Sequence, residues 1–145
     1  MLCRLRFAWK QQRFRDTACV SKAERFAVSA RTAELAERCL RTLREWSRLQ
    51  RDTSRLATRK ANRLADAQRV YLQTLSTTPG GRRHVEAFLD DDEPGVRAWA
   101  AAQVLFWNEP DARRVLECLG SSDTFPFNFN AEMTLREFDA GRLRL

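Results

Sequence analysis

Residues 89–105 read LDDDEPGVRAWAAAQVL, and this stretch decides the fold. It predicts the end of one helix, an acidic turn closed by Pro94 and Gly95, and a second helix over residues 94–107. Proline suits the first helical turn, because its missing N–H has no partner there. The alanines around Trp99 leave the second helix apolar on nearly every side. Such a helix is expected at the centre of a bundle, contacted from several directions.

The four acids that precede this helix predict a structural hinge. Arg97 is expected to pair with Asp90, Asp91 or Asp92, and the hinge residues are therefore Asp92, Pro94 and Arg97. A calcium loop needs spaced ligands and a closing bidentate acid, which this stretch lacks. The acids are interpreted as solvated capping charge, and neither a metal nor another cofactor is expected.

Amphipathic helices are predicted on both sides of the hinge. Apolar residues recur every three or four positions in five further segments: residues 32–50, 54–75, 82–89, 110–119 and 130–140. The first two are joined by cap residues and predict an antiparallel hairpin. The remaining helices pair as 82–89 with 94–107 and 110–119 with 131–140, and the acidic turn between the first two resembles that of a HEAT-type repeat. The predicted class is all-α, a helical hairpin followed by a short HEAT-like array of about two helix pairs.

The composition is that of one folded domain. Of the 145 residues, 43% are hydrophobic and 31% charged, so wholesale disorder is not expected. No apolar run approaches the roughly 20 residues of a membrane-spanning helix. Residues 1–28 are predicted to be a basic extension, poorly ordered or translated from a mis-assigned start, and residues 29–145 a single helical domain. The four cysteines have no paired spacing, which favours a reducing, cytoplasmic compartment.

The net charge of +7 is divided unevenly along the chain. Residues 1–28 carry +5, residues 29–84 carry +8, and residues 85–145 carry −6. Either the two halves pack against each other or each faces a different partner. Mutual packing, with the surplus arginines left in solvent, is the preferred interpretation.

Two binding functions are consistent with these patterns. The first is a protein-binding module that uses the acidic half and its aromatic residues, with candidate contacts at Asp90, Asp91, Trp99, Trp107, Phe125 and Phe127. The alternative is a nucleic-acid binder that uses the basic face of residues 31–63, with candidate contacts at Arg41, Arg44, Arg48, Arg59, Lys60 and Arg63. The aromatics between 121 and 129 are expected to close the end of the core, or alternatively to form an exposed binding edge.

Catalysis is not predicted by any motif. His84 is the only histidine, and no serine, cysteine or carboxylate is visibly placed to use it. An enzyme would need an activated nucleophile, a metal cluster or a tuned acid–base pair. The sequence therefore favours a binding protein.

Four motifs follow one another in a characteristic order: Arg59-Lys60-Ala61-Asn62-Arg63, Gly80-Gly81, the acidic turn with Val-Arg and Ala over residues 92–101, and Met133-Thr134-Leu135. In this order they resemble a small bacterial family, the domain of unknown function twenty-nineteen, over residues 31–145. The resemblance implies a compact HEAT-like helical domain without established enzymatic activity. Proteins of this build often bind other proteins, and some are bacterial immunity proteins, so an immunity or antitoxin-like role is what the resemblance implies.

Overall fold

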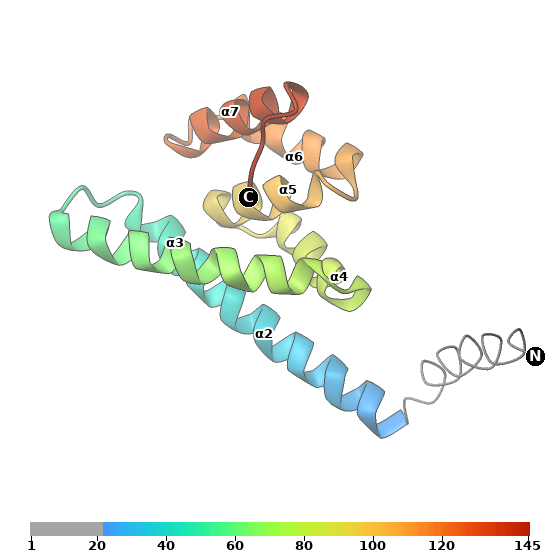
Figure 1. Cartoon of the computed structure of the whole chain (residues 1–145). Coiled ribbons are helices and arrows are strands. Elements are labelled where there is room, and N and C mark those ends of the chain that lie inside the picture. Colours follow the sequence, from blue (N-terminus) through green and yellow to red (C-terminus); the bar gives the residue numbers. More distant parts are fainter. Residues whose placement is uncertain (1–21) are drawn as a thin grey trace, which may run out of the picture. The chain divides into compact units, whose positions relative to one another are not determined.

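The computed structural model describes residues 22–145, which are helical with no strand among them (Figure 1). The elements are α2 (Lys22–Leu49), α3 (Arg55–Ser76), α4 (Pro79–Ala87), the 3-10 helix η1 (Phe88–Asp90), α5 (Pro94–Val104), α6 (Glu109–Gly120) and α7 (Phe127–Asp139). The predicted all-α class is confirmed, and a helical hairpin followed by an array is compatible with this order. No helix within residues 22–145 combines the length and apolar character that a membrane crossing needs.

The chain divides into two compact units, Met1–Arg31 and Thr32–Leu145, and the second unit contains the core. Helix α2 begins at Lys22, ten residues before the predicted start at Thr32. Alanine, arginine and glutamate between residues 22 and 31 favour a helix, so nothing local stops it there. Residues 22–28 of the predicted basic extension are therefore helical, and residues 1–21 lie outside the described residues. The boundary between 28 and 29 stays a prediction.

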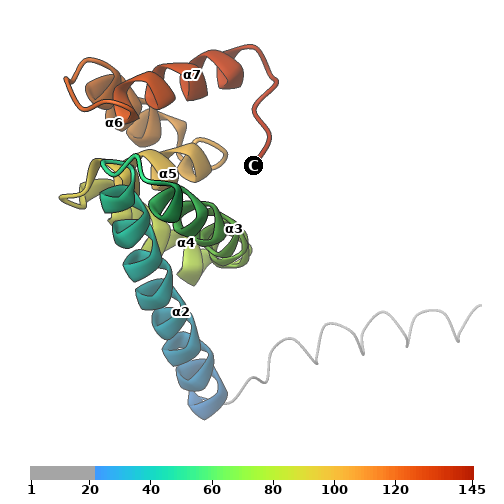
Figure 2. The same ribbon diagram turned by 90° about the vertical axis from the view of Figure 1, so that its left-hand side faces the viewer.

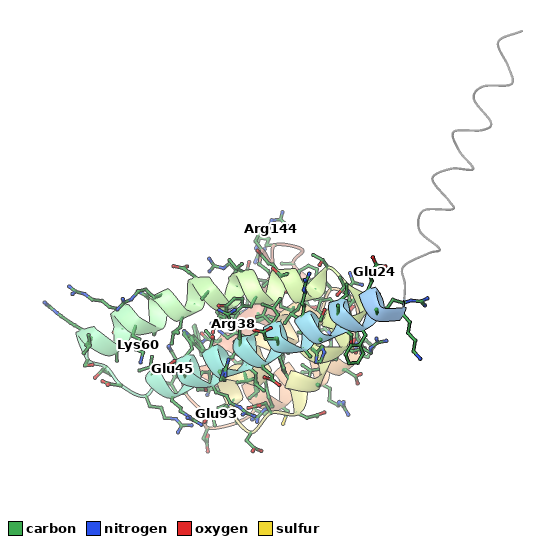
Figure 3. All side chains as sticks on the ribbon, turned by 90° about the horizontal axis from the view of Figure 1, so that it is seen from below. Glu24, Arg38, Glu45, Lys60, Glu93 and Arg144 are labelled. Carbon is green, nitrogen blue, oxygen red and sulfur yellow. The ribbon has the colours of Figure 1, made fainter. Side chains whose placement is uncertain are left out.

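Residues 32–49 of α2 and the whole of α3 form the predicted antiparallel hairpin (Figures 2 and 3). The connection is capped as its sequence predicts, because Ser54 Oγ accepts a hydrogen bond from the N–H of Ala57 at 3.2 Å. An Asp52 carboxylate oxygen in turn accepts from the N–H of Ser54 at 2.8 Å. Lys60 and Glu45 form an ion pair across the hairpin (Figure 3).

The glycine-rich break after α3 is shorter than the sequence predicts. Helix α4 starts at Pro79, whereas the predicted start was Arg82. Thr78 caps it, because Thr78 Oγ1 accepts from the N–H of Gly81 at 3.0 Å, and Pro79 needs no partner in the first turn. The prediction missed this start because proline and two glycines suggest a loop when the cap is not recognised.

Helix α5 is central, as predicted. Eight of its eleven residues are buried, and it packs against α3, α4, α6 and α7. It ends at Val104, three residues before the predicted end. Gly95 permits the close approach of α2, because a Cβ at this position would lie 2.6 Å from Ser47 Oγ and 2.9 Å from Phe127 Cε1.

Helices α6 and α7 pack together at the end of the array, and the predicted start of α7 is wrong. Pro126 occupies the cap position and Phe127 is the first helical residue, so Asn130 lies inside the helix and does not cap it. Gly141, directly after the end of the helix, has a φ of 68°, the left-handed conformation in which glycine commonly terminates a helix. Beyond Gly141 the chain turns back toward α5 (Figures 1 and 2).

Candidate functional site

An apolar groove of about 400 Å³ is formed by residues of α2, α5, α7 and the segment that follows α7. Four of its twelve lining residues are aromatic and come from three helices: Trp46, Trp99, Phe127 and Phe129. We call this the aromatic groove. Its size and mainly apolar lining are those of sites that bind ligands or the side chains of a partner.

The floor of the aromatic groove is a set of edge-to-face ring contacts. The ring centroids of Trp46 and Trp99 are 5.7 Å apart with the planes at 85°, and those of Trp46 and Phe127 are 6.1 Å apart at 61°. Aromatic pairs in this arrangement each contribute about 0.5–1.5 kcal/mol beyond the area they bury. Phe127 is only 2% exposed, so this ring joins the floor to the core.

The rim of the groove, in contrast, exposes aromatic surface. Phe129 lies two residues after Phe127 on α7, about 200° around the helix axis, so it cannot share the buried position. Its exposed fraction is 56%, and that of Phe125, just before the helix, is 78%. A buried aromatic floor with exposed aromatics beside it is typical of a binding surface.

One wall of the groove is polar and comes from a single face of α7. Asn130, Thr134 and Glu137 recur at spacings of four and three residues, which places them on one side of the helix. The Arg142 guanidinium donates two hydrogen bonds to the Glu137 carboxylate, at 3.0 and 2.8 Å. These bonds lower the pKa of Glu137 below its ordinary value, so its carboxylate is ionised at neutral pH and is paired with the Arg142 cation.

The acidic turn is a docking element that fixes α5 against α2. Arg44 holds the Asp91 carboxylate through Nη2 at 2.7 Å and Nε at 3.1 Å, and Arg48 Nε donates to Glu93 at 3.2 Å. Ser47 Oγ donates to Glu93 at 3.1 Å and accepts from the N–H of Gly95 at 3.2 Å. Ser47 directly follows Trp46, so these bonds also hold Trp46 against α5.

Arg97 pairs with Asp91 and Asp92 and braces the turn as predicted, through their backbone and not through their carboxylates. Its Nη1 donates to the backbone carbonyl oxygens of Asp91 at 2.6 Å and Asp92 at 3.0 Å. The Asp91 carboxylate is occupied by Arg44, and the bend of the turn leaves these two carbonyls without helical partners. Pro94 is buried in the first turn of α5, and the carboxylates of Asp90 and Asp92 have no ion pair within residues 22–145.

The structure brings together two of the six residues predicted for protein contact. Trp99 and Phe127 line the groove. Phe125 is exposed without lining it, and Asp90 is exposed on the turn. Trp107 lies apart, where its Nε1 donates to Glu86 at 2.8 Å and the Arg82 guanidinium lies 5.2 Å from the ring. The Asp91 side chain is only 5% exposed, so it is a structural residue.

Half of the residues predicted for nucleic-acid contact are engaged within the protein. Arg44 and Arg48 bind the acidic turn, and Lys60 binds Glu45. The other half have no carboxylate partner in the described part of the chain: Arg41, Arg59 and Arg63. The uneven charge predicted that the basic half of the chain packs against the acidic half, residues 85–145. At the acidic turn the two halves do pack together.

The described part of the chain has two free cysteines and no cluster of potential metal ligands. Residues 22–145 contain no group of three or more His, Cys, Asp or Glu side chains that could hold a metal ion. Burial raises the pKa of the Cys39 thiol to about 12, so it stays protonated and behaves as a small apolar side chain. Cys118 is exposed, and Cys3 and Cys19 lie outside the described residues.

Comparisons with known proteins support the fold. No family model and no curated protein matches the chain. Among solved structures, the protein RPA1889 from Rhodopseudomonas palustris CGA009 is similar, with a TM-score of 0.69 and 23% sequence identity over 79% of this chain and 93% of that one. At this identity the similarity concerns the fold alone. Membership of the domain of unknown function twenty-nineteen family stays a prediction.

Proposed function

We propose that this chain is a non-catalytic protein-binding module that receives an apolar segment of a partner protein in the aromatic groove. The observation that carries the proposal is the exposed Phe129 rim beside a floor of mutually packed rings from Trp46, Trp99 and Phe127. Tryptophan and tyrosine dominate binding energy where they lie in packed pockets, because they offer large area at a small cost in side-chain entropy. The proposal places the module in the bacterial cytoplasm.

The class of partner is suggested by the family resemblance. Small HEAT-like bacterial proteins include immunity proteins that neutralise toxins, and we extend that role to this chain as part of the proposal. A toxin partner would make the groove part of an inhibitory contact. Neutralisation by binding alone needs no catalytic group, which agrees with the composition of the groove.

The experiment compares two exposed phenylalanines. Phe129 lines the groove and is 56% exposed, whereas Phe106 is 55% exposed and packs against Phe138 away from the groove. Phe129→Ser and Phe106→Ser remove the same ring from surfaces of the same exposure. The wild type and both variants, with unchanged circular dichroism, serve as bait in an extract of the source organism, and recovered proteins are quantified by mass spectrometry.

We expect the wild type and Phe106→Ser to recover the same stoichiometric partner, and Phe129→Ser to lose at least tenfold of it. A partner that is a toxin should be neutralised in cells by the wild type and not by Phe129→Ser. Equal recovery by all three baits, or recovery of no partner, would contradict the proposal.

Nucleic-acid binding remains the second candidate, and one observation favours it. Arg41, Arg59 and Arg63 are exposed on the α2–α3 hairpin and have no carboxylate partner in the part of the chain that the structure describes. The salt dependence of such binding separates this candidate from the first, as argued at the end of the Discussion.

A further inference from the structure

Residues 142–145, with the sequence Arg-Leu-Arg-Leu, border the aromatic groove. Leu143 and Leu145 both line it. The segment has no regular secondary structure, and leucines two residues apart fall on the same side of an extended chain. The chain thus already presents an alternating aliphatic segment to the aromatic floor.

A small number of contacts holds this segment in place. Arg142 binds Glu137 through its side chain, and the backbone N–H groups of Arg142 and Leu143 donate to the Glu137 carbonyl oxygen at 2.8 and 3.1 Å. At the other end, Gln73 donates to the carbonyl oxygen of Leu145 at 3.4 Å, a long hydrogen bond. Leu143 is half-buried and its neighbours are exposed. Segments with few buried contacts and exposed hydrogen bonds open at low free-energy cost.

We infer that the partner segment is an extended stretch with a basic residue followed by alternating large aliphatic residues, and that it displaces residues 142–145 from the groove when it binds. This inference rests on the proposed function and specifies the partner's chemistry. Each requirement has a counterpart in the groove. The aromatic floor receives the aliphatic side chains, and the Glu137 carboxylate pairs with the basic residue, as it now pairs with Arg142.

Charge across the acidic half favours the same partner. Residues 85–145 carry a net charge of −6, and only Asp91 and Glu93 among their acids are paired with arginines of the hairpin. The remaining negative charge attracts a basic segment more than an acidic one. The internal segment competes with the partner, so the measured dissociation constant is the intrinsic one divided by the fraction of molecules with an open groove. If the segment is docked about nine-tenths of the time, its removal strengthens binding about tenfold, which corresponds to about 1.4 kcal/mol.

The test uses a fluorescein-labelled peptide, Gly-Arg-Leu-Arg-Leu-Gly, and the full chain. Anisotropy titrations compare the wild type with Leu145→Ser and with the double variant Leu143→Ser, Leu145→Ser. The single variant is included because Leu143 also contacts the core and the double change could disturb folding. Two control peptides replace either both arginines with glutamate or both leucines with serine.

We expect the double variant to bind the Arg-Leu peptide about tenfold more tightly than the wild type does, and Leu145→Ser to bind it several-fold more tightly. Both control peptides should bind at least tenfold more weakly, and Glu137→Gln should remove the preference over the glutamate peptide.

Equal or weaker binding by the leucine variants would overturn displacement, because residues 142–145 would then be a permanent wall. Equal binding of the glutamate peptide would overturn the basic partner. A partner recovered from extract in a Phe129-dependent manner, with no peptide binding, would leave the proposed function standing and reject this inference.

Discussion

Gly81 shows how a single residue sets the path of the chain between the hairpin and the array. A Cβ built at Gly81 would lie 2.0 Å from the carbonyl oxygen of Leu75 and 2.7 Å from its carbonyl carbon. Both are backbone atoms, so they cannot move aside as a flexible side chain would. Gly80, its neighbour, has nothing within 4 Å of the same position.

Alanine should therefore have opposite effects at the two glycines. Gly81→Ala forces α3 and α4 apart and is expected to destabilise the fold by about 2 kcal/mol or more, as overpacking commonly does. Gly80→Ala fills open space in a helix and should stabilise by roughly 0.5–1 kcal/mol, because alanine loses less backbone entropy than glycine. Urea unfolding followed by circular dichroism measures both values. Equal effects of the two substitutions would contradict the role given to Gly81.

Only some residues of the aromatic groove could be predicted from the sequence, because local patterns do not show which helices meet. Trp99 was predicted because it is the one aromatic residue among the alanines of residues 98–102, and Phe127 because it belongs to the aromatic stretch 125–129. Trp46 was recognised only as an apolar position of its helix, since nothing near it in the sequence indicates that α2 meets α5. Its role depends on contacts between residues more than 50 positions apart, which local periodicity does not encode.

At the scale of elements, the acidic turn acts as a clasp between α2 and α5. The Asp91 side chain is nearly buried and accepts hydrogen bonds from Arg44 and from the N–H of Glu93 at 3.0 Å. The Arg44 side chain stays 45% exposed, so water weakens the attraction of its charge without removing the bonds. The pair should therefore contribute more than a surface ion pair and less than a fully buried one.

A double-mutant cycle tests this clasp. Arg44→Ala should cost about 2 kcal/mol, because it leaves the Asp91 carboxylate buried without its cation, and Asp91→Ala about the same, because the turn also loses its internal bond. The coupling energy should be about 1 kcal/mol or more. Arg41→Ala, on the same helix and without an ion pair in the described residues, should stay within about 0.5 kcal/mol of the wild type. An Arg44→Ala effect no larger than that of Arg41→Ala would show that the turn is held by other contacts.

Helix identities were predicted more securely than helix ends. The alanine-rich stretch predicted the central position of α5, because an apolar surface all round must be covered on several sides. The starts of α4 and α7 were misplaced by three residues. For α4, the glycines after Pro79 suggested a later start, whereas capping by Thr78 determines the actual one. For α7, the amide of Asn130 suggested a later start, whereas the packing of Phe127 on Trp46 determines the actual one. Such choices between cap residues are decided by tertiary contacts.

At the scale of the whole molecule, some of the basic residues pair with acids of the same chain, which leaves fewer of them available to bind nucleic acid. The basic hairpin and the acidic array meet at the turn, where Arg44, Arg48 and Arg51 bind Asp91 and Glu93. Charges that neutralise each other inside the protein release no counterions when nucleic acid binds. The number of basic residues on the hairpin therefore overstates the number of cations that it offers to phosphate.

The salt dependence of nucleic-acid binding measures this number directly. From about 0.9 per phosphate, binding through all six predicted contacts gives a slope of log affinity against log salt near −5.4. Binding through only the three of those six that lack an ion pair gives about −2.7. We expect a labelled DNA duplex, titrated by anisotropy between low and moderate salt, to show the shallower slope or no binding. Asp91→Ala releases Arg44 and should steepen the slope by about 0.9, and Arg59→Gln with Arg63→Gln should flatten it by about 1.8. A wild-type slope near −5.4 that Asp91→Ala leaves unchanged would mean that Arg44 already contacts phosphate, so the clasp opens on nucleic acid. The basic face would then become the functional surface, and the aromatic groove would lose its place as the preferred site.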